Sequence, residues 1–316
     1  MSSPANSFDN GPAISFAEFE AIFEKTKTWS LFSDSTIQRG ALNFIDAEVV
    51  KNALTHVKTG RVVPMALPWN TVAGLDNSKP ALHYMTEIGD VEEPEPTCNK
   101  DFIGVDYHGK ASSHLDAPTH IAFKGTLFGG KKSNEVVNST GSAWCSVDKL
   151  GPIVTRGVLL DAARLDGLDW LEPGTAVRAK DILRMEEKFG FTLQKGDCVL
   201  LRSGHFARRE KIGVWDPNKL SAGFYVDAME LFKERQVSVI GADGDSDVRP
   251  SPVEGVGSPI HVLALPAMGI PLLDNLQLEA IAAACADEKR WTFQMIIAPL
   301  NVPRGTGSPV NPIAVL

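Results

Sequence analysis

Residues 105–125 read VDYHGKASSHLDAPTHIAFKG, and positions 108 to 120 of this segment hold three of the chain's seven histidines and one aspartate. His114 and Asp116 are two residues apart, so in an extended strand their side chains point the same way. His120 follows Pro118, which forces a turn that can bring the imidazole back over the same point. Imidazole nitrogen and carboxylate oxygen are ligands favoured by Zn²⁺, Mn²⁺ and Fe²⁺. The segment therefore predicts a divalent metal site, the alternative being a polar turn with incidental histidines.

Composition is that of an ordinary globular protein and argues against several partners. The 316 residues are 43% hydrophobic and 22% charged. Because 31 basic and 39 acidic residues give a net charge of −8, and no Lys/Arg-rich run occurs, nucleic acid and membrane surfaces are not expected as partners. No apolar stretch is long enough to span a membrane, and the N-terminal residues do not resemble a secretory signal. Four separated cysteines without a C-x-x-C pair indicate buried thiols of a cytoplasmic protein.

Apolar periodicity predicts a helical extension on an α/β body. Apolar residues between positions 16 and 23 follow a helical period, with Ser15 and Glu18 at capping-box spacing at its start. A second helix is expected with Asp46 as its cap and Gly60 as its stop. We therefore predict an N-terminal helical extension over residues 1–60, packed on a main domain over residues 61–316. From about residue 157 onward, strand-like and helical segments alternate, which is typical of α/β layering. The proline-rich tail from Asn301 is expected to be irregular and to lie across the surface or across a partner subunit.

Common catalytic and nucleotide-binding motifs are missing from the sequence. It contains no G-x-S-x-G pentapeptide, which a serine hydrolase of the α/β-hydrolase type needs, and no G-x-G-x-x-G dinucleotide-binding motif. Residues 125–133, GTLFGGKKS, approach a phosphate-binding loop, but Lys132 stands where Ser or Thr would hold magnesium. A flexible basic loop is the better interpretation of this segment.

SSHLDAPTH, residues 112–120, resembles the H-x-G-T-H-x-D-x-P-x-H signature of the cyclase family of metal-dependent hydrolases, which includes bacterial kynurenine formamidases and isatin hydrolases. Weaker similarity to the same family extends, in the same order along the chain, from about residue 38 to 300. It includes SPIHVLALPAMGIPLLDNLQLEAI, residues 258–281. The resemblance implies a mixed β/β/α sandwich of the swivelling-domain type. It also implies a homo-oligomer, either a dimer or a tetramer.

Carried over by position, the family motif implies that His114 and Asp116 ligate the metal. It implies that His120 binds a second ion or acts as the catalytic base. The C-terminal segment contributes His261, as an oxyanion or metal contact, and Asp274 as a ligand where relatives commonly have Glu or Gln.

The chain departs from the motif at its first histidine, because Lys110 stands four residues before His114. His108 lies six residues before it and could supply the missing imidazole if the strand continues through a bulge. Otherwise Lys110 takes the position, where its ammonium would repel a second cation and could hold an anionic substrate.

The resemblance implies hydrolysis of an amide, cyclic amide or lactone bond in a small molecule, with Zn²⁺ or Mn²⁺ as cofactor. His120 would take the proton from the attacking water and return it to the leaving group. His261 would hold the oxyanion or help to bind the metal. Trp69 and Phe123 are candidates for an aromatic substrate pocket, beside Lys110. Two alternatives stay open, a metal-dependent lyase or cyclase acting on a polyketide-like substrate, and a binding protein that has lost turnover.

Overall fold

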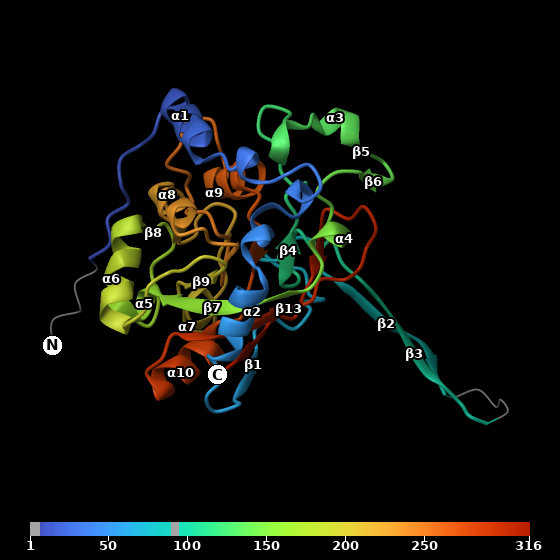
Figure 1. The fold of residues 1–316 in the computed structure, drawn as a ribbon. Coiled ribbons are helices and arrows are strands. Elements are labelled where there is room, and N and C mark those ends of the chain that lie inside the picture. The colour runs from blue at the N-terminus through green and yellow to red at the C-terminus, as the bar shows by residue number, and fades with distance from the viewer. Residues whose placement is uncertain (1–6, 90–94) are drawn as a thin grey trace.

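The computed structural model describes residues 7–89 and 95–316 and is built around a nine-stranded sheet (Figure 1). The order across the sheet is β1-β15-β13-β7-β9-β11-β12-β4-β14. Its strands are β1 (Val62–Pro64), β4 (His114–Asp116), β7 (Ile153–Asp161), β9 (Cys198–Arg202), β11 (Val239–Ala242), β12 (Leu272–Asp274), β13 (Thr292–Ile297), β14 (Gly307–Pro309) and β15 (Ile313–Val315).

The centre of the sheet is parallel and its flanks are antiparallel. Strands β7, β9, β11 and β12 pair in parallel, and the strands outside them pair antiparallel. Parallel neighbours need crossover connections, and helices lie in these connections. The helices are α5 (Ala162–Leu165), α6 (Ala179–Phe189), α7 (His205–Ile212), α8 (Asp227–Glu234), α9 (Pro259–Val262) and η4 (Leu263–Met268).

Both faces of the sheet are buried. Along β7, Val158 and Leu160 pack into one hydrophobic core, while Leu159 between them packs into the other. Strand β9 alternates in the same way, with Leu201 on the first side and Leu200 on the second. This two-sided burial is the arrangement expected of a layered α/β fold, and the predicted fold class is confirmed.

The N-terminal residues form the helices that the sequence predicts. Helix α1 (Phe16–Thr26) begins with the expected capping box between Ser15 and Glu18, and it contacts α8 and η4. Helix α2 (Ala47–Leu54) is capped by Asp46 as predicted and lies against β7 and β13. The second helix ends earlier than expected, since Leu54 and not residue 59 is its last residue. The domain boundary at residue 60 stays a prediction.

The prediction of an irregular C-terminal tail is wrong for residues 307–316, which add two strands to the sheet, whereas residues 301–306 form no helix or strand. Strand β14 pairs with β4, and β15 lies between β13 and β1 in the sheet. Leu316, the last residue, is fully buried. The sequence does not indicate these strands because each has only three residues, which are too few to show a two-residue period. The proline and glycine residues around them also suggest an irregular segment.

Smaller elements surround the sheet. Strands β2 (Leu82–Ile88) and β3 (Asn99–Gly104) form an antiparallel ribbon that projects from the body (Figure 1). The remaining elements are η1 (Trp29–Leu31), η2 (Ile37–Phe44), η3 (Phe128–Gly130), α3 (Ser133–Val136), β5 (Val137–Asn138), β6 (Gly141–Ser142), α4 (Val147–Leu150), β8 (Ala176–Val177), β10 (Gly223–Phe224) and α10 (Glu279–Glu288). Among the described residues, no helix combines the length and hydrophobicity needed to cross a bilayer.

Candidate metal centre

Strand pairing joins the two segments singled out in the sequence. Strands β4 and β12 are antiparallel neighbours, and His114 pairs directly with Asp274. Because side chains alternate along a strand, His114 and Asp116 share one face of the sheet with Asp274. All three side chains are buried, and each offers a ligand atom within 4.8 Å of the others. The predicted convergence of His114 and Asp116 is therefore present in the fold.

Asp116 lies among four imidazoles. Its Oδ1 accepts a 2.7 Å hydrogen bond from His108 Nδ1 and lies 3.7 Å from His114 Nε2. Its Oδ2 lies 3.9 Å from His120 Nε2 and 3.6 Å from His261 Nε2. One buried carboxylate thus faces three imidazoles of the segment 108–120 and one imidazole from α9.

His108 reaches Asp116 through a turn. The strand does not continue to His108 as its predicted role as a metal ligand would need, because β3 ends at Gly104 and a turn closes between residues 106 and 109. His108 also meets Thr306, with 2.9 Å between Nε2 and Oγ1. The His120 ring stacks on the His108 ring, with 3.7 Å between centroids and 5° between planes. A hydrogen bond from His120 N to the carbonyl of residue 117 closes the turn predicted around Pro118.

His261 is positioned by carboxylates on both sides of its ring. Its Nδ1 donates a 2.5 Å hydrogen bond to Asp247 Oδ2. Its Nε2 faces Asp274 Oδ2 at 3.3 Å and Asp116 Oδ2 at 3.6 Å. A carboxylate on Nδ1–H directs the lone pair of a neutral histidine to Nε2, as in many metal-binding histidines. That lone pair then faces two carboxylate oxygens, which is repulsive unless a proton or a cation lies between them, so the donor set fits a divalent cation.

Asp274 is itself held in place, which bears on the resemblance because that resemblance implies the longer Glu or Gln at this position. Its Oδ1 accepts hydrogen bonds from Ser246 Oγ at 2.7 Å and Ser246 N at 3.2 Å. Its Oδ2 is the oxygen that faces His261. The shorter side chain therefore still reaches the cluster directly.

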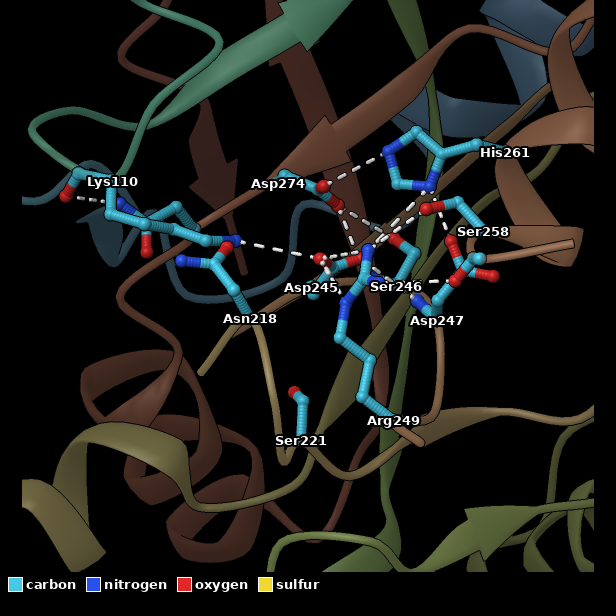
Figure 2. Close-up of polar contacts among 12 residues, drawn as sticks. Lys110, Asn218, Ser221, Asp245, Ser246, Asp247, Arg249, Ser258, His261 and Asp274 are labelled. Atoms are coloured by element: carbon cyan, nitrogen blue, oxygen red, sulfur yellow. Dashed lines mark hydrogen bonds and ion pairs between the residues drawn. The ribbon is translucent and has the colours of Figure 1, made fainter. Parts of the chain in front are cut away.

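Lys110 does not join the imidazole cluster. Figure 2 shows it extended toward Asp245, with 3.7 Å between Nζ and Oδ2. Arg249 Nη2 binds the same oxygen at 2.8 Å and also donates to Ser258 Oγ, while Arg249 Nη1 donates to the carbonyl of Gly257. Asp245 Oδ1 lies 3.9 Å from His261 Nδ1. Lys110 and Arg249 thus supply two cations to a carboxylate next to the centre.

Asp245, Asp247 and Arg249 were not among the predicted site residues. Their signal is present in VSVIGADGDSDVR, residues 237–249, where acidic residues directly follow a buried strand. In α/β sheets, sites form beyond the carboxyl ends of parallel strands. The run of aspartates directly after β11 marks such a carboxyl end, and this is the signal in the sequence that points to these residues.

Burial and neighbouring charge shape the protonation of the cluster. Burial lowers the pKa of His114, and it lowers the pKa of His120 from 6.5 to about 4, so both rings are neutral near neutral pH. Burial alone would raise the pKa of Asp116, but the His108 hydrogen bond and the adjacent imidazoles outweigh it and lower that pKa. Burial opposes protonation of His261, yet hydrogen bonds to Asp247 and Asp274 raise its pKa well above 6.5.

A cavity of about 600 Å³ lies beside residues that adjoin the centre, with Lys110, Gly244 and Asn275 in its wall. The side chain of Asn275, next to Asp274, donates hydrogen bonds to the carbonyls of Lys110 at 3.0 Å and Ser112 at 3.2 Å, which ties the cavity wall to the cluster. Arg209 in the wall forms an ion pair with Asp76. The lining includes Trp69, Asn70, Val72, Lys110, His205, Phe206, Arg209, Gly244, Asn275 and Gln277.

The two aromatic residues predicted for a substrate pocket lie in different places. Trp69 lines the cavity beside Lys110. Phe123 packs against Phe19 and Phe23 of α1, with ring centroids 5.8 Å and 4.7 Å away. The Phe123 ring therefore joins α1 to the loop that follows His120.

Residues 40–246 match the family model named Cyclase. The match covers more than half of the chain, and the protein belongs to the Cyclase family. A crystal structure described as a novel cyclase is similar over 93% of this chain and 99% of its own, with a TM-score of 0.83 and 25% identity.

Two isatin hydrolases share the fold. Isatin hydrolase A from Ralstonia solanacearum is 22% identical, with a TM-score of 0.54 over 80% of this chain and 91% of its own. Isatin hydrolase A from Labrenzia aggregata is 20% identical, with a TM-score of 0.56 over 84% of this chain and 98% of its own. A search of curated protein sequences gave no match.

Proposed function

We propose that this Cyclase-family protein is a divalent-metal-dependent hydrolase of an amide, cyclic amide or lactone bond in a small aromatic or carboxylate-bearing molecule. The observation that carries the proposal is the cluster of imidazoles around the buried Asp116, near a cavity that can admit a small molecule. Neutral imidazole and carboxylate ligands suit Zn²⁺ or Mn²⁺. The names of the isatin hydrolases that share the fold agree with this proposal.

We assign metal binding to His114, Asp116 and Asp274, with His261 Nε2 as a further ligand. The first three place ligand atoms within 4.8 Å of one another, and His261 Nε2 faces both carboxylates. A bound divalent cation lowers the pKa of water and polarises a carbonyl group. His261, predicted as a catalytic residue, has the orientation of a ligand because Asp247 holds its Nδ1–H.

We assign proton transfer to His120. Its lowered pKa leaves the ring neutral, so it can accept a proton from the attacking water and return it to the leaving nitrogen or oxygen. The stacked His108 ring fixes the plane of the His120 ring. Since His108 contacts both Asp116 and Thr306, we assign it to positioning these groups instead of binding the metal.

Lys110 and Trp69 supply the recognition groups of the cavity. The ammonium of Lys110 lies 3.7 Å from Asp245, longer than a hydrogen bond, so it has donors available for an anionic group. Trp69 offers an aromatic surface in the same cavity wall. This pairing suits a small molecule that has both an aromatic ring and a carboxylate.

The test combines elemental analysis with a substrate panel of formamides, lactams and lactones in ¹⁸O-labelled water. We expect wild-type protein to contain metal and to place solvent oxygen in the product. Asp116→Ala should lose the metal, whereas His120→Ala should keep it and lose about 10²–10⁴-fold in turnover. His56→Gln, remote from the centre and hydrogen-bonded to Thr292, is the matched control and should keep both.

Each result separates the proposal from its alternatives. Turnover without incorporation of solvent oxygen would favour a lyase or cyclase. Bound metal without turnover of any panel member would favour a binding protein. Full activity of His120→Ala would overturn the role of His120.

A further inference from the structure

Two amide side chains in the wall of the cavity have a fixed orientation. Asn70 and Gln277 line the cavity together with Lys110. Asn70 Oδ1 accepts a 2.9 Å hydrogen bond from the backbone N–H of Val72. Gln277 Oε1 accepts a 3.0 Å hydrogen bond from the backbone N–H of Glu279. Because a backbone N–H can only donate, these two bonds determine which end of each amide is the oxygen.

The groups left without a partner in this part of the wall are donors. Within the described residues, neither Asn70 Nδ2 nor Gln277 Nε2 has a hydrogen-bond partner. Lys110 Nζ lies 3.7 Å from Asp245, longer than a hydrogen bond, and its side chain is only 16% exposed (Figure 2). Asp245 is already bound by Arg249 at 2.8 Å, so it does not fully neutralise the Lys110 charge. The two amides and the ammonium therefore offer donors and no acceptor to a bound molecule.

Hydrogen bonds hold these three donors on neighbouring segments of the chain. The backbone N–H of Asn70 binds the carbonyl of Ala111 at 2.8 Å, and Ala111 directly follows Lys110. The side chain of Asn275 binds the Lys110 carbonyl at 3.0 Å, and Gln277 lies two residues further along the same segment. The three segments are thus fixed relative to one another before any ligand binds.

The charge of this part of the wall matches a ligand with one negative charge. Arg209, also in the wall, is paired with Asp76, and Glu210 is exposed to solvent. Lys110 therefore supplies the positive charge, with a neutral N–H₂ group on each of the two amides. This set suits a carboxylate, whose two oxygens accept several hydrogen bonds. A dianionic phosphate would leave one negative charge uncompensated.

We propose that Lys110, Asn70 and Gln277 form a binding site for one carboxylate of the substrate, here called the carboxylate subsite. This inference rests on the proposed hydrolase function and extends it, because it makes Asn70 and Gln277 specificity-determining residues. Asn275, which binds the Lys110 carbonyl, directly follows the proposed metal ligand Asp274. A substrate that reaches both the metal and the subsite therefore carries its carboxylate apart from the bond that is cleaved.

Isothermal titration calorimetry with benzoate and its neutral isostere benzamide tests the subsite without any turnover. We expect wild type to bind benzoate about 10–100-fold more tightly than benzamide, because hydrogen bonds to a charged group are the stronger ones. Asn70→Asp and Gln277→Glu should each remove this preference. Each variant keeps the oxygen that accepts the backbone N–H and replaces only the N–H₂ group by a second oxygen. A merely structural role of either amide would therefore leave the preference unchanged.

Thr71→Asp is the matched control, because it adds the same charge to the same cavity wall at an exposed residue outside the subsite. It should change the preference by less than about threefold, since solvent screens an exposed charge. Equal affinity of wild type for benzoate and benzamide, an unchanged preference in Asn70→Asp or Gln277→Glu, or an equal loss in Thr71→Asp would overturn the proposal.

Two further outcomes separate the subsite from its alternatives. Tighter binding of phenyl phosphate than of benzoate would overturn the assignment to a single carboxylate. A preference for benzoate in a protein that hydrolyses no formamide, lactam or lactone would support the subsite and count against the proposed function.

Discussion

Asp247→Asn should weaken metal binding without removing any proposed ligand. Asp247 Oδ2 accepts the hydrogen bond from His261 Nδ1 at 2.5 Å, and its Oδ1 accepts one from the backbone N–H of Ile260 at 2.6 Å. Asparagine has the same shape but only one acceptor oxygen, so one of these two donors loses its partner. The charge that fixes the His261 tautomer is lost as well.

The magnitude follows from the role of such supporting carboxylates. Replacing a group that orients a metal-binding histidine typically weakens metal affinity about 10–100-fold. That corresponds to about 1.4–2.7 kcal/mol. The ligands themselves stay in place, so the variant should still bind one ion when the metal is in excess.

Competition of metal-free protein with a chromophoric chelator measures the affinity. Asp287→Asn is the control, since it makes the same change in charge at an exposed residue that pairs with Arg61. We expect the control to match wild type. Equal affinity in Asp247→Asn and wild type would refute the assignment of His261 as a ligand oriented by Asp247.

Three further outcomes are expected. Burial lowers the pKa of His56 to about 4, so the folded state binds fewer protons than the unfolded state between that pH and 6.5. The free energy of unfolding should therefore fall as pH drops from 7 to 5, by about 1 kcal/mol after discounting for the partial exposure of the ring. Urea unfolding of His56→Gln at the two pH values should lack this part of the decrease. Gly40 has a φ of 54°, and a Cβ added there would lie 2.1 Å from the Gly269 carbonyl oxygen. Gly40→Ala should therefore lower the free energy of unfolding by about 1–3 kcal/mol. An unchanged midpoint of urea unfolding would contradict this prediction. Lys110→His should raise the bound metal from one to two ions per chain in elemental analysis, and a constant single ion would show that Lys110 does not limit occupancy.

Local patterns predicted those parts of the fold that local contacts determine. The Ser15–Glu18 capping box and the Asp46 cap both lie within one helical turn of the residues they satisfy. His114 and Asp116 needed only the two-residue period of a strand. The prediction for the tail from Asn301 was wrong because its strands are defined by distant partners and not by their own composition.

The missed half of the site depends on sheet order. Asp245 and Asp247 follow β11, and β12 lies between β11 and the strand that carries Asp116. Only this order brings a segment near residue 245 to one near residue 116. The sequence shows a strand before these aspartates but does not show which strands lie beside it, so the aspartates could be noticed but not placed.

Charge balance at the centre argues for one divalent cation. Asp116 and Asp274 contribute two negative charges, and His114 and His120 are neutral because burial lowers their pKa values. A single divalent ion, bound where the proton on His261 Nε2 would otherwise lie, neutralises these two carboxylates.

The neighbouring acidic pair, Asp245 and Asp247, does not favour binding of a second cation. Asp245 is neutralised by Arg249 at 2.8 Å, with Lys110 close by, and Asp247 is occupied by His261 and the Ile260 N–H. Another cation here would meet two fixed positive side chains in buried surroundings, where an uncompensated charge is costly. A second cation would therefore have to displace Arg249 or Lys110 from Asp245.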